Sequence, residues 1–399
     1  MKVVNVSFFY DEKLRTENEL LKQHYTTTGW AEALNKKGVE VIVMNRFYKD
    51  GCVYENNIKH LFFKDRLKGS FRSWQMPLNF FKKIAELNAD VVHVHHLTLS
   101  LQTLLLRIIL PKKTAIIVQH HGGRAPGRLK RMLHNFLIGA ADGFFFTTAE
   151  QGTEWFIKKA YKKILPVMEG ATFFNYQNRN AGNTIHDYER SKAREITGIS
   201  GSLVFLWVGR LDENKDPLTV LNGFKTILEK YATARLYMIY NDSKLVKAVN
   251  ETILSSDILK EKVHLLGNIN HAEIEMYYNS ADYFVLGSHY EGSGYALSEA
   301  LRCGCVPVIT DIPSFRMMTD NGRLGSLWKT GDKDSLIEAV DRVTQKNLED
   351  EMKACTSFFE KKLSFDSIAA TAILHYQKVI DQRLQKKFKK TPVSRYAQQ

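Results

Sequence analysis

The chain has 399 residues, of which 44% are hydrophobic and 25% are charged, and this length is sufficient for two domains with complete cores. Its longest apolar candidate for a membrane span, residues 97–110, is short and contains Arg107, and the early acidic residues Asp11 and Glu12 do not fit a secretory signal. Four cysteines, of which only Cys303 and Cys305 are close, fit neither a disulfide framework nor a zinc site. We therefore expect a cytoplasmic globular protein.

The basic residues are concentrated in the first part of the chain. Residues 1–180 carry a net charge of +12, residues 181–380 carry −4 and residues 381–399 carry +5. This asymmetry favours an anionic partner for one face, such as a membrane lipid, an acidic glycan or a nucleic acid. A solvated surface that only aids solubility is the alternative.

Short apolar runs alternate with helical segments along both halves of the chain. Such alternation, with buried strands, predicts a parallel sheet covered on both faces. The polar, weakly patterned residues 175–200 are the expected linker between two such domains. Strands are expected over 3–9, 39–44, 91–95, 115–118, 143–147, 203–208, 235–240, 263–266, 283–286 and 306–310, and helices over 29–37 and 367–388.

The most informative segment is residues 288–299, in which two carboxylates, Glu291 and Glu299, flank a glycine loop. A helix that ends at Gly304 is expected to follow the loop. Backbone N–H groups at the start of such a helix can hold a phosphate, while a carboxylate can accept hydrogen bonds from sugar hydroxyls. Strand–glycine–helix turns also occur in every doubly wound protein, so this segment alone leaves a structural role open.

Further glycines and cations follow other predicted strands. Gly209 and Arg210 end the strand 203–208, and Lys215 follows five residues later, so the two cations could clamp a diphosphate. Gly267 ends the strand 263–266. Taken singly, each is more often a surface pair or a plain turn, but the carboxyl ends of parallel strands would bring them together.

In combination these residues resemble glycosyltransferase family 4. The family's pair of glutamates separated by seven residues matches Glu291 and Glu299, and its Val-Gly-Arg-Leu stretch with a following lysine matches residues 208–211 and Lys215. Residues 90–95 also resemble the family, and the resemblance covers about residues 1–380. The family's Glu-Ala, Gly and Pro-Val positions are matched by Glu299, Ala300, Gly304, Pro307 and Val308.

The resemblance implies an α/β protein of the GT-B fold, with two Rossmann-like doubly wound domains that face each other across a cleft. Residues 1–180 would bind the acceptor, residues 195–367 would bind a nucleotide sugar, and a C-terminal helix within 368–399 would cross back to the first domain. Two departures are residues 28–30, which stand where paired glycines are usual, and Ser293, which stands where an aromatic residue is frequent.

The resemblance also implies roles for individual residues. Glu299 would accept hydrogen bonds from the two ribose hydroxyls, Arg210 and Lys215 would neutralise the diphosphate, and Glu291 would face the transferred sugar. No metal or cofactor is expected, and the Asp-x-Asp sequence at residues 332–334 is interpreted as a loop. The donor-binding set is completed by Gly209, Gly267, Gly292, Ser293, Gly294 and Tyr295.

In the first domain, His121 matches the family's active-site histidine, which contacts the donor sugar, and the adjacent His120 is the other possibility. Gly29 and Gly122 are the expected acceptor-side glycines. Three more histidines leave a metal site open as an alternative, since ligands two apart share one face of a strand. These histidines are His93, His95 and His96.

Cations and aromatic residues are interleaved over residues 59–83, and a second basic group follows the histidine strand. This mixture suits an anionic membrane surface, with a buried structural helix and loop as the alternative. The basic group is Arg124, Arg128, Lys130 and Arg131; the first segment includes Phe62, Phe63, Phe71, Trp74, Phe80 and Phe81.

These expectations define a retaining, metal-independent glycosyltransferase that moves a hexose-type sugar from a UDP- or GDP-sugar to a glycan or lipid-linked glycan in cell-surface polysaccharide synthesis. We expect it at the inner face of the membrane as a peripheral protein. The alternatives are a catalytically silent nucleotide-sugar or glycan-binding module, a nucleotide-sugar epimerase, and a nucleic-acid-binding protein. The family residues argue against the first two, and the absence of a nucleic-acid-binding motif argues against the third.

Overall fold

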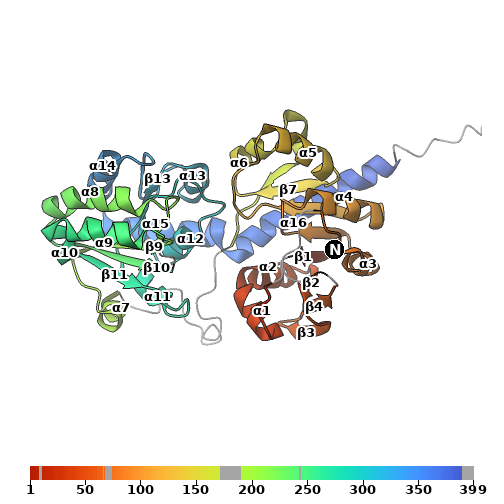
Figure 1. The fold of residues 1–399 in the computed structure, drawn as a ribbon, viewed down its shortest axis with the longest axis horizontal. Helices are drawn as coiled ribbons and strands as arrows, with labels where there is room; N and C mark the ends of the chain where they lie inside the picture. The colour runs from red at the N-terminus through yellow and green to blue at the C-terminus, as the bar shows by residue number, and fades with distance from the viewer. Residues whose placement is uncertain (9–10, 66, 68–73, 171–189, 242–243, 389–399) are drawn as a thin grey trace, which may run out of the picture. The chain divides into compact units, whose positions relative to one another are not determined.

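The computed structural model describes residues 1–8, 11–65, 67, 74–170, 190–241 and 244–388. The chain divides into two compact units: unit 1 is Met1–Met168 with Phe365–Gln399, and unit 2 is Glu169–Ser364. The long helix α16 (Phe365–Phe388) therefore belongs to unit 1, as expected for a helix that returns to the first domain (Figure 1).

Unit 1 contains an eight-stranded sheet in the order β3-β4-β2-β1-β5-β6-β7-β8. Its described strands pair in parallel, except for the antiparallel pair β3 and β4. Val3 of β1 lies opposite Val41 on one side and Val91 on the other. The strands are β1 (Lys2–Ser7), β2 (Glu40–Phe47), β3 (Gly51–Glu55), β4 (Ile58–Lys64), β5 (Val91–Val94), β6 (Ala115–Gln119), β7 (Gly143–Phe146) and β8 (Ile164–Pro166).

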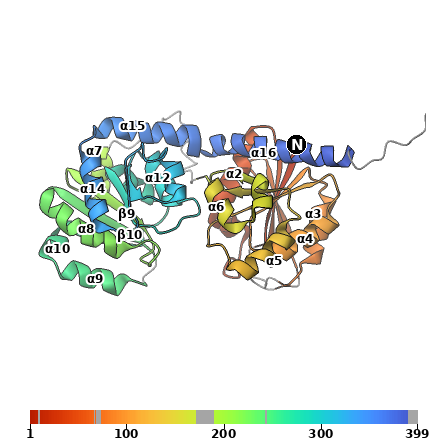
Figure 2. The same cartoon turned by 90° about the horizontal axis from the view of Figure 1, so that it is seen from above.

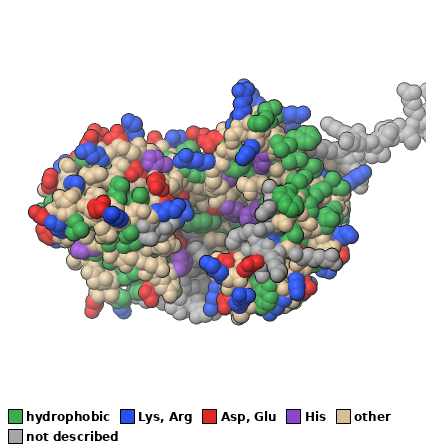
Figure 3. Space-filling model, in the orientation of Figure 1, with side chains coloured by type: hydrophobic (Ala, Val, Ile, Leu, Met, Phe, Trp, Pro, Cys, Tyr) green, Lys and Arg blue, Asp and Glu red, His purple; other side chains and the backbone are tan. Residues whose placement is uncertain are grey.

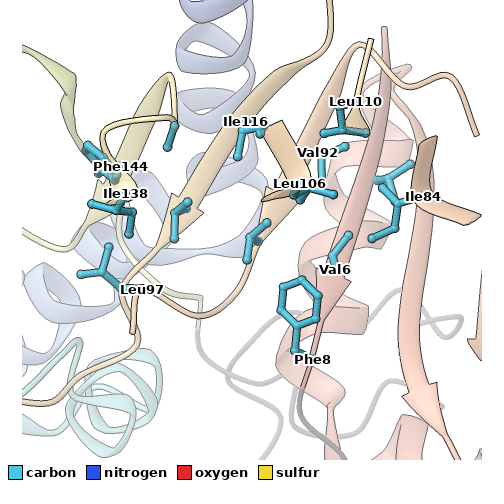
Figure 4. Close-up of a cluster of buried hydrophobic side chains, with 14 of the residues drawn as sticks. Val6, Phe8, Ile84, Val92, Leu97, Leu106, Leu110, Ile116, Ile138 and Phe144 are labelled. Carbon is cyan, nitrogen blue, oxygen red and sulfur yellow. The ribbon is translucent and has the colours of Figure 1, made fainter. Parts of the chain in front are cut away.

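Side chains alternate between the two faces of this sheet. Val92 and Val94 of β5 enter a core with Ile84, Leu106 and Ile138, which come from three different helices (Figure 4). Helices α3, α4 and α5 therefore cover one face of the sheet, whereas α2 and α16 lie on the other (Figure 2). The helices of unit 1 are α1 (Glu17–Gln23), α2 (Tyr25–Lys36), α3 (Leu78–Glu86), α4 (Ser100–Ile109), α5 (Arg128–Ile138), α6 (Ala149–Trp155), the 3₁₀ helix η1 (Lys158–Lys163) and α16.

Helix α16 is held against the sheet and α2 by specific contacts. The Tyr376 hydroxyl forms a hydrogen bond with Nδ1 of His93 on β5 at 2.8 Å, and both side chains are fully buried. An added Cβ on Gly29 would lie 2.7 Å from the ring of Phe365, so the first turn of α16 approaches α2 at a glycine. These contacts join residues more than 280 positions apart in the chain.

Two segments of unit 1 differ from expectation. Residues 17–23, for which no helix was expected, form helix α1, whose start is fixed by a capping box between Thr16 and Glu19. Residues 59–64, for which a helix and loop was the alternative interpretation, belong to strand β4, which pairs with β2 and β3. Strand β4 alternates buried and half-buried residues up to its end, which is typical of a strand near a sheet edge.

Unit 2 contains a six-stranded sheet in the order β11-β10-β9-β12-β13-β14, and its described strand pairs are parallel. The strands are β9 (Leu203–Gly209), β10 (Ala234–Tyr240), β11 (Val263–Gly267), β12 (Tyr283–Leu286), β13 (Val306–Thr310) and β14 (Ser326–Trp328). The helices are α7 (Arg190–Thr197), α8 (Pro217–Lys230), α9 (Val246–Leu254), α10 (Asp257–Lys262), α11 (Ile274–Ser280), α12 (Tyr295–Arg302), α13 (Pro313–Met318), α14 (Lys333–Thr344), α15 (Leu348–Phe358) and the π-helix η3 (Phe359–Leu363).

The expected linker, residues 175–200, lies only partly in the described chain, because residues 171–189 fall outside it. Its last part forms helix α7, which was not expected. Arg190 and Arg194 of α7 both pair with the buried carboxylate of Asp282 at 2.9 Å, and Asp282 also accepts from the Val204 amide. This segment is therefore an integral part of unit 2.

The four cysteines are free, and Cys52 is exposed whereas Cys305 and Cys355 are buried. Among the helices of the described residues, none is both long enough and apolar enough to span a bilayer.

Candidate functional site

The candidate site of unit 2 lies where the order of its strands reverses. From β9 the chain adds β10 and β11 toward one edge of the sheet, and β12, which pairs with the other side of β9, starts the series toward the opposite edge. Ligands of open α/β sheets bind at the carboxyl ends of the strands at this reversal. Arg210 directly follows β9, and Glu291 lies in the loop after β12.

The loops that follow β9 and β12 are joined to each other. The side-chain amide of Asn214 donates to the Tyr290 carbonyl at 2.9 Å, and the His289 amide donates to the Asn214 carbonyl at 2.8 Å. Gly287 permits this approach, because an added Cβ there would lie 3.0 Å from the backbone oxygen of Asp216. The two loops therefore form one hydrogen-bonded structure.

Glu291 and Lys215, predicted from separate motifs, form an ion pair between these loops. Glu291 Oε1 also accepts from the Ser288 hydroxyl at 2.6 Å, and the carbonyl of Ser288 is held by Thr310 Oγ1 of β13. Both charged side chains are largely buried, so each one orients the other. The structure thus brings the expected sugar-facing carboxylate beside one of the two expected diphosphate cations.

Glu299 lies one turn inside α12, with 5% of its surface exposed. Its Oε2 accepts from the Tyr278 hydroxyl at 3.1 Å, and its Oε1 lies 3.2 Å from Nε2 of His271. Burial and the adjacent carboxylate raise the pKa of Tyr278 well above its ordinary value, so the phenol remains a donor. The hydrogen bond to Glu299 raises the pKa of His271. Tyr278 and His271 therefore fix the orientation of this carboxylate.

The glycine loop leads into α12 as expected. Gly294 has a φ of 73° and caps the helix, and an added Cβ there would lie 2.8 Å from the ring of Phe315. At the other end, the amides of Gly304 and Cys305 donate to the carbonyls of Leu301 and Ala300, which is the hydrogen-bond pattern of a glycine helix cap. The predicted helix end at Gly304 is confirmed.

The remaining predicted donor residues differ in exposure. Arg210 is mostly exposed, and its Nε lies 3.3 Å from the carboxylate of Asp212. Gly209 lies against the indole of Trp207, where an added Cβ would be at 3.2 Å. Gly267 requires glycine for its φ of 70° rather than for space, since nothing lies within 4 Å of an added Cβ.

Three polar residues of this site were not predicted. The Ser293 hydroxyl donates to the buried carboxylate of Glu169, which is the first residue of unit 2. Tyr278 and His271 are likewise absent from the expected site residues. Glu169 lies 124 residues from Ser293, so no local pattern signals this contact, whereas His271 follows the Gly267 turn and could have been found as a polar side chain at a strand end.

In unit 1 the strand order reverses between β1 and β5, and histidines follow β5 and β6. Nδ1 of His95 lies 3.0 Å from Nε2 of His121, and the two rings are stacked. His95 is buried and His121 is exposed. Burial lowers the pKa of His95 well below its ordinary value and that of His96 to about 4, so both rings are neutral near pH 7.

His120 points away from this pair. Its ring is buried, stacks on Phe146 and lies 3.2 Å from the carbonyl of Gly123. Of the two adjacent histidines, His121 therefore lies with His95. Gly122, the expected acceptor-side glycine, has a φ of 113°, which favours glycine. Gly29 lies inside α2 against Phe365, so helix packing accounts for this glycine.

The metal alternative lacks support in the described part of the chain, where no group of three or more His, Cys, Asp or Glu side chains is arranged to hold an ion. His93 is buried against Tyr376, and its burial lowers its pKa to about 3. At the Asp-x-Asp sequence, Asp332 caps α14 by accepting from the amides of Asp334 and Ser335.

The expected membrane-facing segment is only partly exposed. Phe62, Phe80 and Phe81 are buried in the core of unit 1, so for them the structural alternative is correct, whereas Trp74 is exposed. Phe71 and the nearby cations Arg66, Lys68 and Arg72 lie outside the described residues. The second basic group lies before and within α5: Arg124, Arg128 and Lys130 are exposed, and Arg131 donates to the Glu154 carbonyl.

Two family models match the chain. Residues 189–358 match the model described as "Glycosyl transferases group 1", and residues 25–155 match the one described as "Glycosyltransferase Family 4". The first match covers Lys215, Glu291 and Glu299 of unit 2, and the second covers His95 and His121 of unit 1.

Curated relatives include a GDP-mannose:cellobiosyl-diphosphopolyprenol alpha-mannosyltransferase of Xanthomonas campestris, 26% identical over 59% of this chain, and a UDP-Gal:alpha-D-GlcNAc-diphosphoundecaprenol alpha-1,3-galactosyltransferase of Escherichia coli, 32% identical over 38%. The aligned chain spans 60% and 39% of these two relatives. A counterpart of the mannosyltransferase in Xanthomonas oryzae is 25% identical over 81% of this chain and 82% of its own length.

Solved structures share the fold. A glycosyltransferase from Rickettsia africae has a TM-score of 0.69 at 16% identity, over 95% of this chain and 99% of its own. Anabaena HepE, in complex with UDP and glucose, has a TM-score of 0.66 at 14% identity, over 95% of this chain and 100% of its own. The fold is therefore GT-B, and the chain belongs to glycosyltransferase family 4.

Proposed function

We propose that this protein is a retaining glycosyltransferase that transfers a hexose-type sugar from a UDP- or GDP-sugar to a lipid-linked glycan during cell-surface polysaccharide synthesis. The observation that carries this proposal is the arrangement of Glu291, Lys215 and Glu299 at the strand reversal of unit 2. The relatives named above use GDP-mannose or UDP-galactose and act on glycans linked to polyprenyl diphosphates, which supports the donor and acceptor classes.

Donor binding is assigned to the second unit. The carboxylate of Glu299, oriented by Tyr278 and His271, would accept hydrogen bonds from the two ribose hydroxyls. Arg210, which is exposed, and Lys215 would contact the diphosphate. The backbone of the glycine loop at residues 292–295 would bind a phosphate or the sugar at the start of α12.

In the transfer, the bond between the anomeric carbon and the phosphate oxygen breaks, and a bond to the acceptor oxygen forms on the same face of the sugar. The acceptor proton passes to the departing phosphate oxygen. Lys215 and Arg210 would stabilise the negative charge that develops on the nucleoside diphosphate. Glu291 would hold the sugar hydroxyls. This chemistry requires neither a metal nor a cofactor.

Titration calorimetry with a panel of UDP- and GDP-sugars tests this assignment. We expect one donor to bind tightly to the wild type, and the Glu291→Gln variant to lose affinity for the nucleotide sugar while keeping most of its affinity for the free nucleoside diphosphate. The exposed Glu338→Gln of α14 is the matched control in the same unit. Failure of every donor to bind, or equal losses for sugar nucleotide and free nucleotide, would contradict the assigned roles.

A further inference from the structure

Helix α5 presents apolar side chains to solvent on the side away from the core. The exposed fractions are 83% for Leu129, 61% for Met132, 61% for Leu133 and 79% for Phe136. Their spacing of three, four and seven residues places them in one stripe along the helix. Figure 3 shows hydrophobic side chains gathered over α5 and the neighbouring α4.

The same helix has a separate buried side. His134 and Ile138 are buried, and the side-chain amide of Asn135 donates to the Trp155 carbonyl at 2.9 Å. Packing against the sheet therefore accounts for one side of α5 but not for the stripe. A surface helix of a globular protein normally carries polar residues on its outer side, so the stripe indicates a partner.

The apolar surface extends beyond α5. Helix α4 packs between α3 and α5, and Ile108 of α4 and Leu78 of α3 are exposed. On the other side, Ile157 precedes η1, is exposed, and donates its amide to Asn135 of α5 at 3.1 Å. We define the α5 surface as the exposed side of α5 with these flanking residues.

Cations border the α5 surface. Arg128 and Lys130 are exposed on α5 itself, and Lys158, Lys159 and Lys162 are exposed on η1. The sequence contains no Asp or Glu from residue 91 to residue 141, so every charged residue of α4 and α5 is basic. Between α5 and η1 the acidic residues are Asp142, which is paired with Arg107 and Arg383, and Glu150 and Glu154 of α6.

We propose that the α5 surface docks on an anionic lipid bilayer, with its apolar stripe in the headgroup region and its cations on the lipid phosphates. Lysine is depleted in protein–protein interfaces, whereas Lys and Arg beside Leu and Phe are typical of helices that lie in a membrane surface. Membrane docking does not depend on sugar transfer, so the two functions can fail independently.

Vesicle flotation tests the docking. Wild-type protein is mixed with phosphatidylcholine vesicles or with vesicles that also contain phosphatidylglycerol, and the partition coefficient is measured at low and high salt. We expect binding to the anionic vesicles, weakened by salt because the attraction of the cations is screened.

Two double variants separate the apolar and the charged contributions. Leu129→Ser with Phe136→Ser should lower the partition coefficient about 100-fold on anionic vesicles. Arg128→Gln with Lys130→Gln should lower it about 30-fold on anionic vesicles only. The replaced side chains are exposed, so the fold and nucleotide-sugar binding should remain unchanged.

The control places two apolar-to-serine changes on other helices. Leu254→Ser with Leu374→Ser replaces side chains that are 64% and 71% exposed on α9 and α16, and should bind vesicles like the wild type. Wild-type protein that floats with neither vesicle, or α5 variants that float like the control, would overturn the proposal. So would a wild-type dimer in light scattering that the α5 variants convert to monomers without any vesicle binding.

Discussion

Replacement of Glu299 by glutamine should weaken nucleotide binding without unfolding unit 2. The side chain keeps its volume, and an amide oxygen can still accept from the Tyr278 hydroxyl, while the amide N–H₂ can donate to a neutral His271. The charge of the acceptor is the main loss. We therefore expect a change of less than about 1 kcal/mol in the free energy of unfolding.

The loss in binding would follow from the two ribose hydrogen bonds that we propose for Glu299. A hydrogen bond to a charged group contributes about 1.5–3 kcal/mol and a neutral one about 0.5–1.5 kcal/mol, so each bond should weaken by about 1 kcal/mol. The total of about 2 kcal/mol corresponds to about a 30-fold higher Kd. Titration calorimetry with UDP and GDP, and with their 2′,3′-dideoxy analogues, measures this directly.

The dideoxy analogues make the test specific. Wild-type protein should bind the ribonucleotide more tightly than its dideoxy analogue, and the variant should lose most of that preference. The reasoning is refuted if Glu299→Gln binds the ribonucleotide like the wild type, or if its affinity falls equally for both ligands. Thermal melting of the variant beside Glu338→Gln checks that the fold is retained.

Three further predictions concern other parts of the chain. Lys215→Met should lower kcat by about 100-fold or more, with partial recovery in Lys215→Arg, because the cation stabilises the leaving diphosphate; an unchanged kcat in steady-state assays would contradict this role. Burial lowers the pKa of His60 to about 4. The unfolded chain therefore binds the proton more readily between pH 6.5 and 4. As the pH is lowered through that window, the free energy of unfolding decreases by on the order of 3 kcal/mol. His60→Leu should shift the acid-unfolding midpoint in circular dichroism to lower pH, and an unchanged midpoint would count against this cause. Gly29→Ala should destabilise unit 1 by about 1–3 kcal/mol in urea unfolding, because the added Cβ would lie 2.7 Å from the Phe365 ring, whereas Gly127→Ala, with open space around it, should not; equal effects would exclude this packing account.

Ten of the fourteen described strands were predictable because their apolar runs are short and bounded by glycine or polar residues, whereas β3, β4, β8 and β14 were not predicted. The expected strand 283–286 agrees with the structure to the residue, and Gly304, the expected cap, directly follows the C-cap residue of α12. Local patterns also identified Glu291 and Lys215, which the strand reversal brings into one ion pair. In these segments the local sequence and the final packing favour the same structure.

Other features depend on contacts between distant residues, which local patterns do not contain. The antiparallel hairpin of β3 and β4 turns at Asn56 and Asn57, both with positive φ, and neither strand was predicted, because polar and apolar residues mix at the sheet edge. The buried pairing of Glu169 with Ser293 joins the two ends of a long segment. The exposure of the apolar stripe of α5 was not predicted, since an apolar side of a helix is ordinarily assigned to the core.

The central claim is that this chain transfers a sugar from a nucleotide donor to a lipid-linked glycan. The most direct measurement incubates wild-type protein with labelled UDP- and GDP-sugars and with polyprenyl diphosphates that carry N-acetylglucosamine or cellobiose, and follows the label into the extracted lipid. The account predicts lipid-linked product from one donor, with the anomeric configuration of that donor retained in its NMR spectrum. Tight donor binding without any product across the panel would contradict it and would favour a catalytically silent binding module.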